Sequence, residues 1–179
     1  MPDIRTVKVT LPIIQTSLVT APINGSFTAS HNADVLITTT PTAVPFDTNN
    51  FDSGGSIDHD VATNNTRFVV NKTGTYEFIF QPQVSAVNNN NNGFAFFWLR
   101  KNGTTPIASS TTTFKVNHAT STGLLVTSVI VGLVANDYIE LLTQASNDGE
   151  YMLDYVAGSG AGATARPALP ACIVSVKGW

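Results

Sequence analysis

The chain has 179 residues, of which 42% are hydrophobic, which is enough for one domain with a substantial core but not for a second full domain. Charged residues make up only 12%, about half the usual share, and the formal net charge is −3. The nine Lys and Arg residues stand singly except for Arg100-Lys101, so no basic stripe is available to neutralise phosphates. We therefore expect a neutral surface rich in hydroxyl and amide groups, and no nucleic-acid partner.

The first 26 residues differ from the rest of the chain. They hold two short β-prone pieces, residues 5–11 and 16–21, broken by Pro12 and by the Pro22-Ile23-Asn24-Gly25 turn. We expect an arm or an added edge strand over residues 1–26, followed by one domain over residues 27–179. The early acidic residue and the lack of a long apolar run argue against a signal peptide, and no stretch reaches the roughly 18 apolar residues of a membrane span. The protein is therefore expected to be made in the cytoplasm and to have no membrane partner.

Short β-branched or alternating runs recur between turn signals, and no long helical period appears, which predicts an all-β sandwich. The expected strands are residues 6–11, 33–40, 42–46, 66–70, 74–84, 93–101, 111–117, 123–134, 138–145, 150–156 and 171–177. The asparagine run at residues 88–92 and the Gly/Ala-rich residues 157–164 are expected to be exposed connectors. Cys172 is the single cysteine and lies in an apolar run, which predicts a buried thiol without a disulfide.

The clearest strand signal is a run of alternating aromatic residues. Phe68 is followed after five residues by Gly74, and Tyr76, Phe78 and Phe80 then occupy every second position. Alternation places these three rings on one side of a strand, where a second sheet must cover them. Gly74 is expected to give the backbone freedom that a tight turn at the start of the strand needs. We predict that the aromatic residues pack in the core and bind no ligand.

Two segments, residues 94–99 and 124–134, are apolar on both faces. A sandwich has one core, so the second face must be covered by a neighbouring copy or by the amino-terminal arm. A closed homo-oligomer is the simpler solution, because symmetry closes such contacts. The candidate contact residues are Phe94, Phe96, Phe97, Trp98, Leu125, Val129 and Val131.

The spacing of the aromatic strand resembles the signature of the complement C1q and tumour necrosis factor-like jelly-roll family. Three later motifs follow in the family's order: residues 98–104 resemble a strand with a Lys-Asn-Gly turn, residues 133–141 the Gly-Asp element, and residues 176–179 the closing strand. Asn136 replaces the glycine of the second motif, and because Asn tolerates positive φ we expect the turn to survive. The core signature comprises Phe68, Gly74, Tyr76, Phe78, Phe80, Asn102, Gly103, Asp137 and Gly178.

This resemblance implies a two-sheet, ten-strand jelly-roll sandwich that forms a homotrimer and serves display and binding. One segment departs from the family pattern, because Val61 or, with an insertion, Ile57 stands where a tyrosine usually precedes Phe68. We therefore carry over no ligand geometry through that segment.

No catalytic constellation stands out in the sequence. The histidines His31, His59 and His118 lie in or beside polar turns, with neither a GxSxG elbow nor an HExxH helix. We expect no enzyme activity, no cofactor and no small-molecule substrate. Four acidic residues offer oxygen atoms to calcium, which some relatives hold near the trimer axis, but their spacing fits no twelve-residue calcium loop and turn formation explains them better. They are Asp47, Asp52, Asp58 and Asp60.

The combination of motifs is most similar to single-domain versions of the family among virion proteins of tailed bacteriophages. The resemblance implies a trimeric capsid decoration protein, located in the virion, that binds the major capsid protein or another virion protein and stabilises the shell. The alternative is the receptor-binding tip of a tail fibre or spike, which usually follows a shaft with heptads or repeats, and this sequence has neither. A free C1q-like lectin is disfavoured, since neither a signal peptide nor a disulfide is expected.

Overall fold

A computed structural model describes residues 25–88, 92–115, 118–119, 121–160 and 165–179. One set of strands comprises β1 (Gly25–His31), β2 (Val35–Ile37), β4 (Thr48–Asp52), β7 (Gly74–Ala86), β11 (Thr122–Leu124), β12 (Thr127–Leu133), β14 (Tyr151–Leu153) and β15 (Cys172–Gly178). The other set comprises β3 (Thr42–Ala43), β5 (Ile57–Asp58), β6 (Phe68–Val70), β8 (Ala95–Lys101), β9 (Thr105–Pro106), β10 (Thr112–Phe114) and β13 (Tyr138–Ala145).

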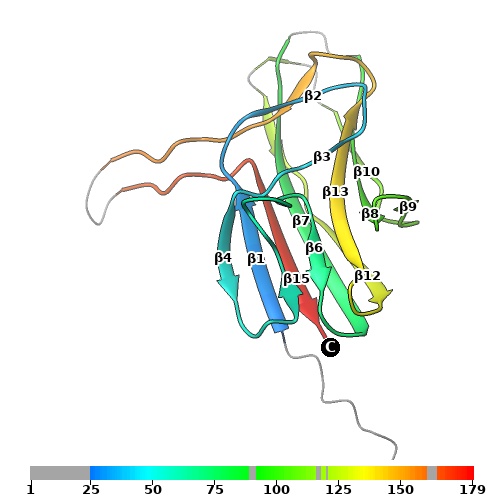
Figure 1. Ribbon diagram of the computed structural model, residues 1–179. Coiled ribbons are helices and arrows are strands. Elements are labelled where there is room, and N and C mark those ends of the chain that lie inside the picture. The colour runs from blue at the N-terminus through cyan, green and yellow to red at the C-terminus, as the bar shows by residue number, and fades with distance from the viewer. Residues whose placement is uncertain (1–24, 89–91, 116–117, 120, 161–164) are drawn as a thin grey trace, which may run out of the picture.

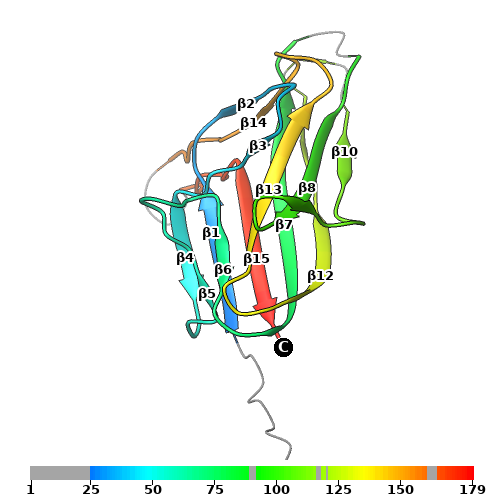
Figure 2. The ribbon, with the colours of Figure 1, turned by 45° about the vertical axis from the view of Figure 1, so that its right-hand side comes forward.

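These strands form two packed antiparallel sheets (Figure 1). The β7 sheet has the order β2-β14-β7-β15-β1-β4, with β11 and β12 added along β7. The β8 sheet has the order β10-β8-β13-β6-β5, with β3 beside β13 and β9 beside β8. The turned view shows the two sheets face to face, with β12 and β10 along the same side of the sandwich (Figure 2). The prediction of an all-β, two-sheet sandwich is therefore confirmed.

The aromatic strand lies at the centre of the β7 sheet. β15 pairs with one edge of β7 and β12 with the other, so that Val176 and Val129 stand opposite Phe78 on either side. Tyr76, Phe78 and Phe80 are fully buried between the sheets, and the Tyr76 hydroxyl donates a hydrogen bond to the Lys72 carbonyl at 2.7 Å. Full burial of one such side chain contributes roughly 1.5–3 kcal/mol, so the three rings together are a substantial part of the core.

Several predicted boundaries were wrong. The expected strand 33–40 is only Val35–Ile37, and 42–46 is only Thr42–Ala43. β1, β4, β5 and β9 were not predicted, and β1 begins at Gly25, inside the segment assigned to the arm. Gly74 is the first residue of β7, and its φ is not among the positive values, so no left-handed turn explains it. The predicted strand 6–11 lies outside the described residues.

The start of the first strand, β1, and the end of the last strand, β15, lie side by side. Gly25 at the start of β1 pairs with Gly178 at the end of β15, so the first described residue lies beside the carboxyl terminus (Figure 1). Gly25 is required there, because a Cβ atom at this position would lie 2.5 Å from the Ser56 hydroxyl oxygen.

The segment between β14 and β15 projects from the sandwich as a narrow ribbon (Figure 1). Val156 bridges Leu169 and Ser159 bridges Arg166, and the Arg166 guanidinium donates to the Ala157 carbonyl at 2.6 Å. The predicted connector 157–164 lies at its far part, of which residues 161–164 are outside the described residues.

A candidate self-association surface

β12 presents an apolar outer face at one side of the sandwich. Its side chains alternate, so that Val129 and Leu133 point into the core while Ile130 is 66% exposed. Leu124 and Val126, which precede it, are 62% and 59% exposed. Residues 122–134 contain no charged side chain, and among the described residues β12 is paired only with β7. An exposed, uncharged apolar edge strand of this kind is a template for association with another chain.

The outer face of the β7 sheet adjoins this edge. Glu77 stands between Ile130 on β12 and Lys177 on β15, and Ile79 stands between hydroxyl residues of the same two strands. The Ser128 hydroxyl donates to the Glu77 carboxylate at 2.6 Å, which fixes that side chain on the face. A shallow hollow of about 220 Å³ is lined there by Thr28, Glu77, Ile79, Ser175 and Lys177. The face thus combines apolar patches with a few polar groups, as a protein interface does.

The structure separates the predicted contact residues into two groups. Phe97 and Val129 are buried in their own protomer, and Leu125 and Val131 pack against the same core. These four side chains offer little or no surface to a neighbouring copy, because the alternation turns them inward. Phe94, Phe96 and Trp98 point outward from β8, where Phe94 is exposed and the other two are half-buried. Ile79 and Glu77 were not predicted as contact residues, although their alternation with Phe78 already placed them on the outer face.

Two of the sequence motifs meet at one end of the sandwich. Asn102 and Gly103 both have positive φ, 50° and 71°, and form the hairpin turn between β8 and β9. Asn136 has φ 73°, which confirms the expected left-handed turn. The Asn102 amide donates to Asp137 at 2.8 Å and accepts from the Tyr138 N–H at 2.9 Å. The two turns therefore hold each other in place.

Asp137 is the centre of this clasp. Its carboxylate lies 2.6 Å from the Lys101 ammonium and accepts the Val134 N–H at 2.8 Å. Burial alone raises the pKa of Asp137, but the hydrogen bonds from Lys101, Asn102 and Val134 outweigh it and lower the pKa to about 2. The carboxylate thus stays ionised over the whole physiological range and serves structure rather than proton transfer.

We expect the stability contributed by Asp137 to depend on pH. A lowered carboxyl pKa stabilises the fold fully above the ordinary value of 3.8, and this contribution is lost as the pH falls towards 2. Asp137→Asn should lose about 1.5–3 kcal/mol at pH 7, the size of a hydrogen bond to a charged group. In urea unfolding, the gap between wild type and variant should narrow between pH 5 and pH 2. Asp47 and Asp60 also have lowered pKa values, but they are present in wild type and in Asp137→Asn, so their effects cancel in the comparison. A difference in unfolding free energy that stays constant from pH 5 to pH 2 would contradict the role assigned to Asp137.

Three of the four acidic residues considered for calcium accept hydrogen bonds within the protein, and the fourth, Asp58, is an exposed residue of β5. Asp52 accepts the N–H groups of Gly54 and Gly55, and Asp47 accepts hydrogen bonds from Asn32. Asp60 caps its own turn in the same way. Within the described residues, no group of three or more His, Cys, Asp or Glu side chains is placed to hold a metal ion.

One buried ion network was not predicted. Glu140 is 3% exposed and accepts two hydrogen bonds from the Arg100 guanidinium, at 2.8 and 3.0 Å, while Arg67 approaches its other oxygen at 3.6 Å. The network ties β13 to β8 and leaves the carboxylate fully engaged. Cys172 is buried as predicted, and burial raises the pKa of its thiol. In the part of the chain that the structure describes, there is no helix of the length and apolar character needed to cross a membrane.

Comparisons with known proteins agree on the fold. No protein-family model matches the chain, and no curated protein matches it either. Among solved structures, the globular domain of the zebrafish complement 1qA protein is 13% identical with a TM-score of 0.54, covering 86% of this chain and 96% of its own. The crystal structure of murine APRIL at pH 8.5 has 11% sequence identity and a TM-score of 0.54, and the match covers 86% of this chain and 98% of that chain. The chain therefore has the C1q and tumour necrosis factor-like jelly-roll fold that its sequence signature predicted.

Proposed function

We propose that this protein is a non-enzymatic, homotrimeric structural component of a tailed-phage virion, in which it decorates and stabilises the capsid. The observation that carries the trimer is the uncovered apolar edge of β12 beside the outer face of the β7 sheet. The C1q and tumour necrosis factor-like fold favours the same oligomer. The virion assignment comes from the resemblance of the four sequence motifs to single-domain phage proteins.

In the proposed trimer, the β12 edge of one copy packs on the outer face of the β7 sheet of the next. Such a contact joins two different patches, so it closes into a ring when the rotation suits three copies. Ile130 and Val126 would then be buried against Ile79 and its neighbours. The trimer would cover the exposed edge that a monomer leaves open.

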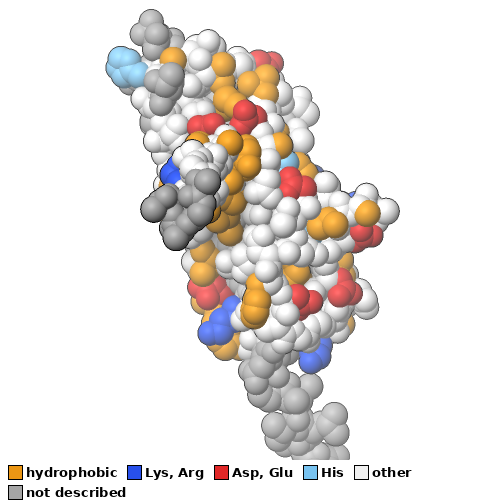
Figure 3. Space-filling view, turned by 90° about the vertical axis from the view of Figure 1, so that its left-hand side faces the viewer, with side chains coloured by type: hydrophobic (Ala, Val, Ile, Leu, Met, Phe, Trp, Pro, Cys, Tyr) orange, Lys and Arg blue, Asp and Glu red, His pale blue; other side chains and the backbone are white. Residues whose placement is uncertain are grey.

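The proposed docking element is residues 1–24. They join β1 at Gly25, beside the carboxyl terminus, so three copies related by a threefold axis would present their arms at one end. Their β-prone pieces have the alternation needed to add a strand to an edge of a capsid protein. The rest of the surface offers little electrostatic attraction, since Lys and Arg appear only as isolated spots on the face seen in Figure 3.

Deleting residues 1–24 should leave a folded, soluble trimer that no longer binds capsids. The deletion stops before β1, so every described strand is kept. Intact and deleted proteins would be co-sedimented with empty capsids assembled without the protein. A third protein, with residues 1–24 in shuffled order, controls for the length of the arm.

Equal binding by intact and deleted protein would contradict the arm assignment. Binding by neither would favour the second candidate, a receptor-binding tip. For that function, the loops at the sandwich end opposite Gly25 should govern host adsorption, and substitutions at residues 88–92 should change it. The ribbon at residues 157–164 is the other candidate loop for the tip.

A further inference from the structure

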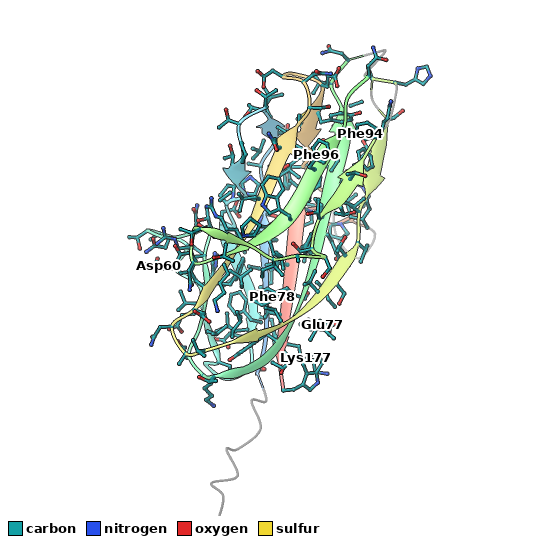
Figure 4. The ribbon with its side chains drawn as sticks, turned by 90° about the vertical axis from the view of Figure 1, so that its right-hand side faces the viewer. Asp60, Glu77, Phe78, Phe94, Phe96 and Lys177 are labelled. Carbon is teal, nitrogen blue, oxygen red and sulfur yellow. The ribbon has the colours of Figure 1, made fainter. Side chains whose placement is uncertain are left out.

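The outer face of β8 carries an aromatic column that the proposed trimer does not use. It consists of Phe94, Phe96 and Trp98, whose alternate neighbours Ala95, Phe97 and Leu99 are buried in the core. Phe94 is 41% exposed, and Phe96 and Trp98 are half-buried. The Phe94 and Phe96 ring centres are 6.2 Å apart with their planes tilted by 42°. Phe94 and Phe96 lie towards the end of the sandwich opposite Glu77 and Lys177 (Figure 4).

Uncharged polar side chains flank the aromatic column. Thr113 on β10 and Gln144 on β13 stand opposite Phe96 on its two sides. The Gln144 amide nitrogen donates to the Thr39 carbonyl at 2.8 Å, which orients the amide and leaves its oxygen as an acceptor. Thr113 is exposed and adds a hydroxyl that both donates and accepts.

The cations beside the aromatic column are already engaged. The Lys115 ammonium lies 5.0 Å from the Phe94 ring centre, and 3.4 Å from the Asn92 carbonyl oxygen. Arg100, two residues beyond Trp98 on the same face, is bound to Glu140. The Glu140 carboxylate neutralises Arg100, so a ligand on the column meets one exposed lysine and uncharged flanks, which favours a neutral ligand.

The exposed area of the aromatic column is small. An aromatic side chain has an area of about 150–250 Å², and Phe94 is 41% exposed while Phe96 and Trp98 are less so, which gives at most on the order of 200 Å² in total. A stable protein interface needs about 800 Å² per partner. The column alone is therefore too small for a folded protein, but it has the size of a short run of sugar rings.

We propose that the aromatic column binds a neutral glycan. Alternate strand positions are roughly 6.6–6.8 Å apart, so the three side chains form a row along which neighbouring sugars of one oligosaccharide can lie. The apolar C–H faces of the sugars pack on the rings, while their hydroxyls bond to Thr113 and Gln144. This activity is independent of the proposed trimer and capsid roles, because the column lies on the β8 sheet and the β12 edge belongs to the β7 sheet.

The test titrates the full-length protein with neutral hexasaccharides of glucose, mannose, galactose, N-acetylglucosamine and rhamnose, monitored by calorimetry and by tryptophan fluorescence. We expect binding of at least one of them, with a change in Trp98 emission that Trp98→Phe abolishes. Phe94→Ala should weaken the binding about tenfold, the loss of one aromatic contact. The matched control is Phe51→Ala, because Phe51 is 55% exposed but lies on β4 of the other sheet, and it should bind like wild type.

Three binding results would each overturn the glycan proposal, and one sedimentation result would do so as well. The binding results are failure of all the hexasaccharides to bind, equal loss of binding in Phe94→Ala and Phe51→Ala, and binding of heparin in preference to every neutral sugar. Sedimentation of the same variants separates this proposal from the trimer. Dissociation of the oligomer in Phe94→Ala would show that the aromatic column is a contact between copies and not a glycan site.

Discussion

The purified protein is expected to sediment at about three times its monomer mass of 19.0 kDa, and Ile130→Asp is expected to reduce this to the mass of one copy. Ile130 is 66% exposed, so the substitution costs the isolated protomer little. In the proposed trimer the same side chain is covered by a neighbouring copy. The new carboxylate would stand beside Glu77 of its own sheet and would lose its water under the neighbouring copy, so burying it would cost far more than the contact yields. Analytical ultracentrifugation at micromolar concentration measures both masses.

Leu36→Asp is the control for this experiment. Leu36 is 54% exposed on β2, so the substitution introduces the same charge at a comparably exposed apolar site away from β12. This variant should remain a trimer, and circular dichroism should show that both variants are folded. A well-folded wild-type monomer, or an Ile130→Asp protein that stays trimeric, would refute the proposed interface.

The strands that sequence analysis found are those whose side chains face the core. Tyr76, Phe78 and Phe80 alternate with polar or smaller residues, and burial of one face of β7 leaves only one register for them. The turn at Asn102 and Gly103 was also predictable from the sequence, because two successive residues with positive φ are most often Asn and Gly. In such segments the local pattern and the tertiary fold require the same residues.

β1 and β4 were missed because their stability does not come from an apolar pattern. β4 has the sequence TNNFD and all of its residues are exposed. β1 contributes only Phe27 and Ala29 to the hydrophobic core. β1 is held by its hydrogen-bond ladder with β15, and β4 by its ladder with β1, which has a register shift between Thr28 and Ala29. Pairing of this kind depends on residues far away in the sequence.

The candidate contact surface was predictable only in part. The alternation in residues 124–134 correctly separated Ile130 from Val129 and Val131, but both sets are aliphatic. Alternation with a period of two residues shows which side chains share a face of the strand. Which of the two faces is buried depends on the neighbouring strands and on the opposite sheet. The predicted contacts Leu125, Val129 and Val131 belong to the inner set for this reason.

Phe78→Ala is expected to cost about 3–5 kcal/mol of unfolding free energy, the usual loss for a buried phenylalanine. Phe78 has no exposed surface and lies between the two sheets, where Val129 and Val176 flank it on the neighbouring strands (Figure 4). Since a domain of this size has roughly 5–15 kcal/mol in total, much of the variant should be unfolded or aggregated at 37 °C. Urea unfolding followed by circular dichroism at lower temperature measures the loss.

Ile79→Ala is the matched control, because Ile79 is the next residue of β7 and points to the outer face. Ile79 is half-buried and lies outside the core, so Ile79→Ala should lower the unfolding free energy of the protomer less than Phe78→Ala does. It lines the hollow on the β7 face, so its larger effect should be a weaker trimer. The two variants thus separate the roles of the two faces of one strand. A Phe78→Ala protein with an unchanged urea midpoint and impaired binding would show that the aromatic face serves a ligand and not the core.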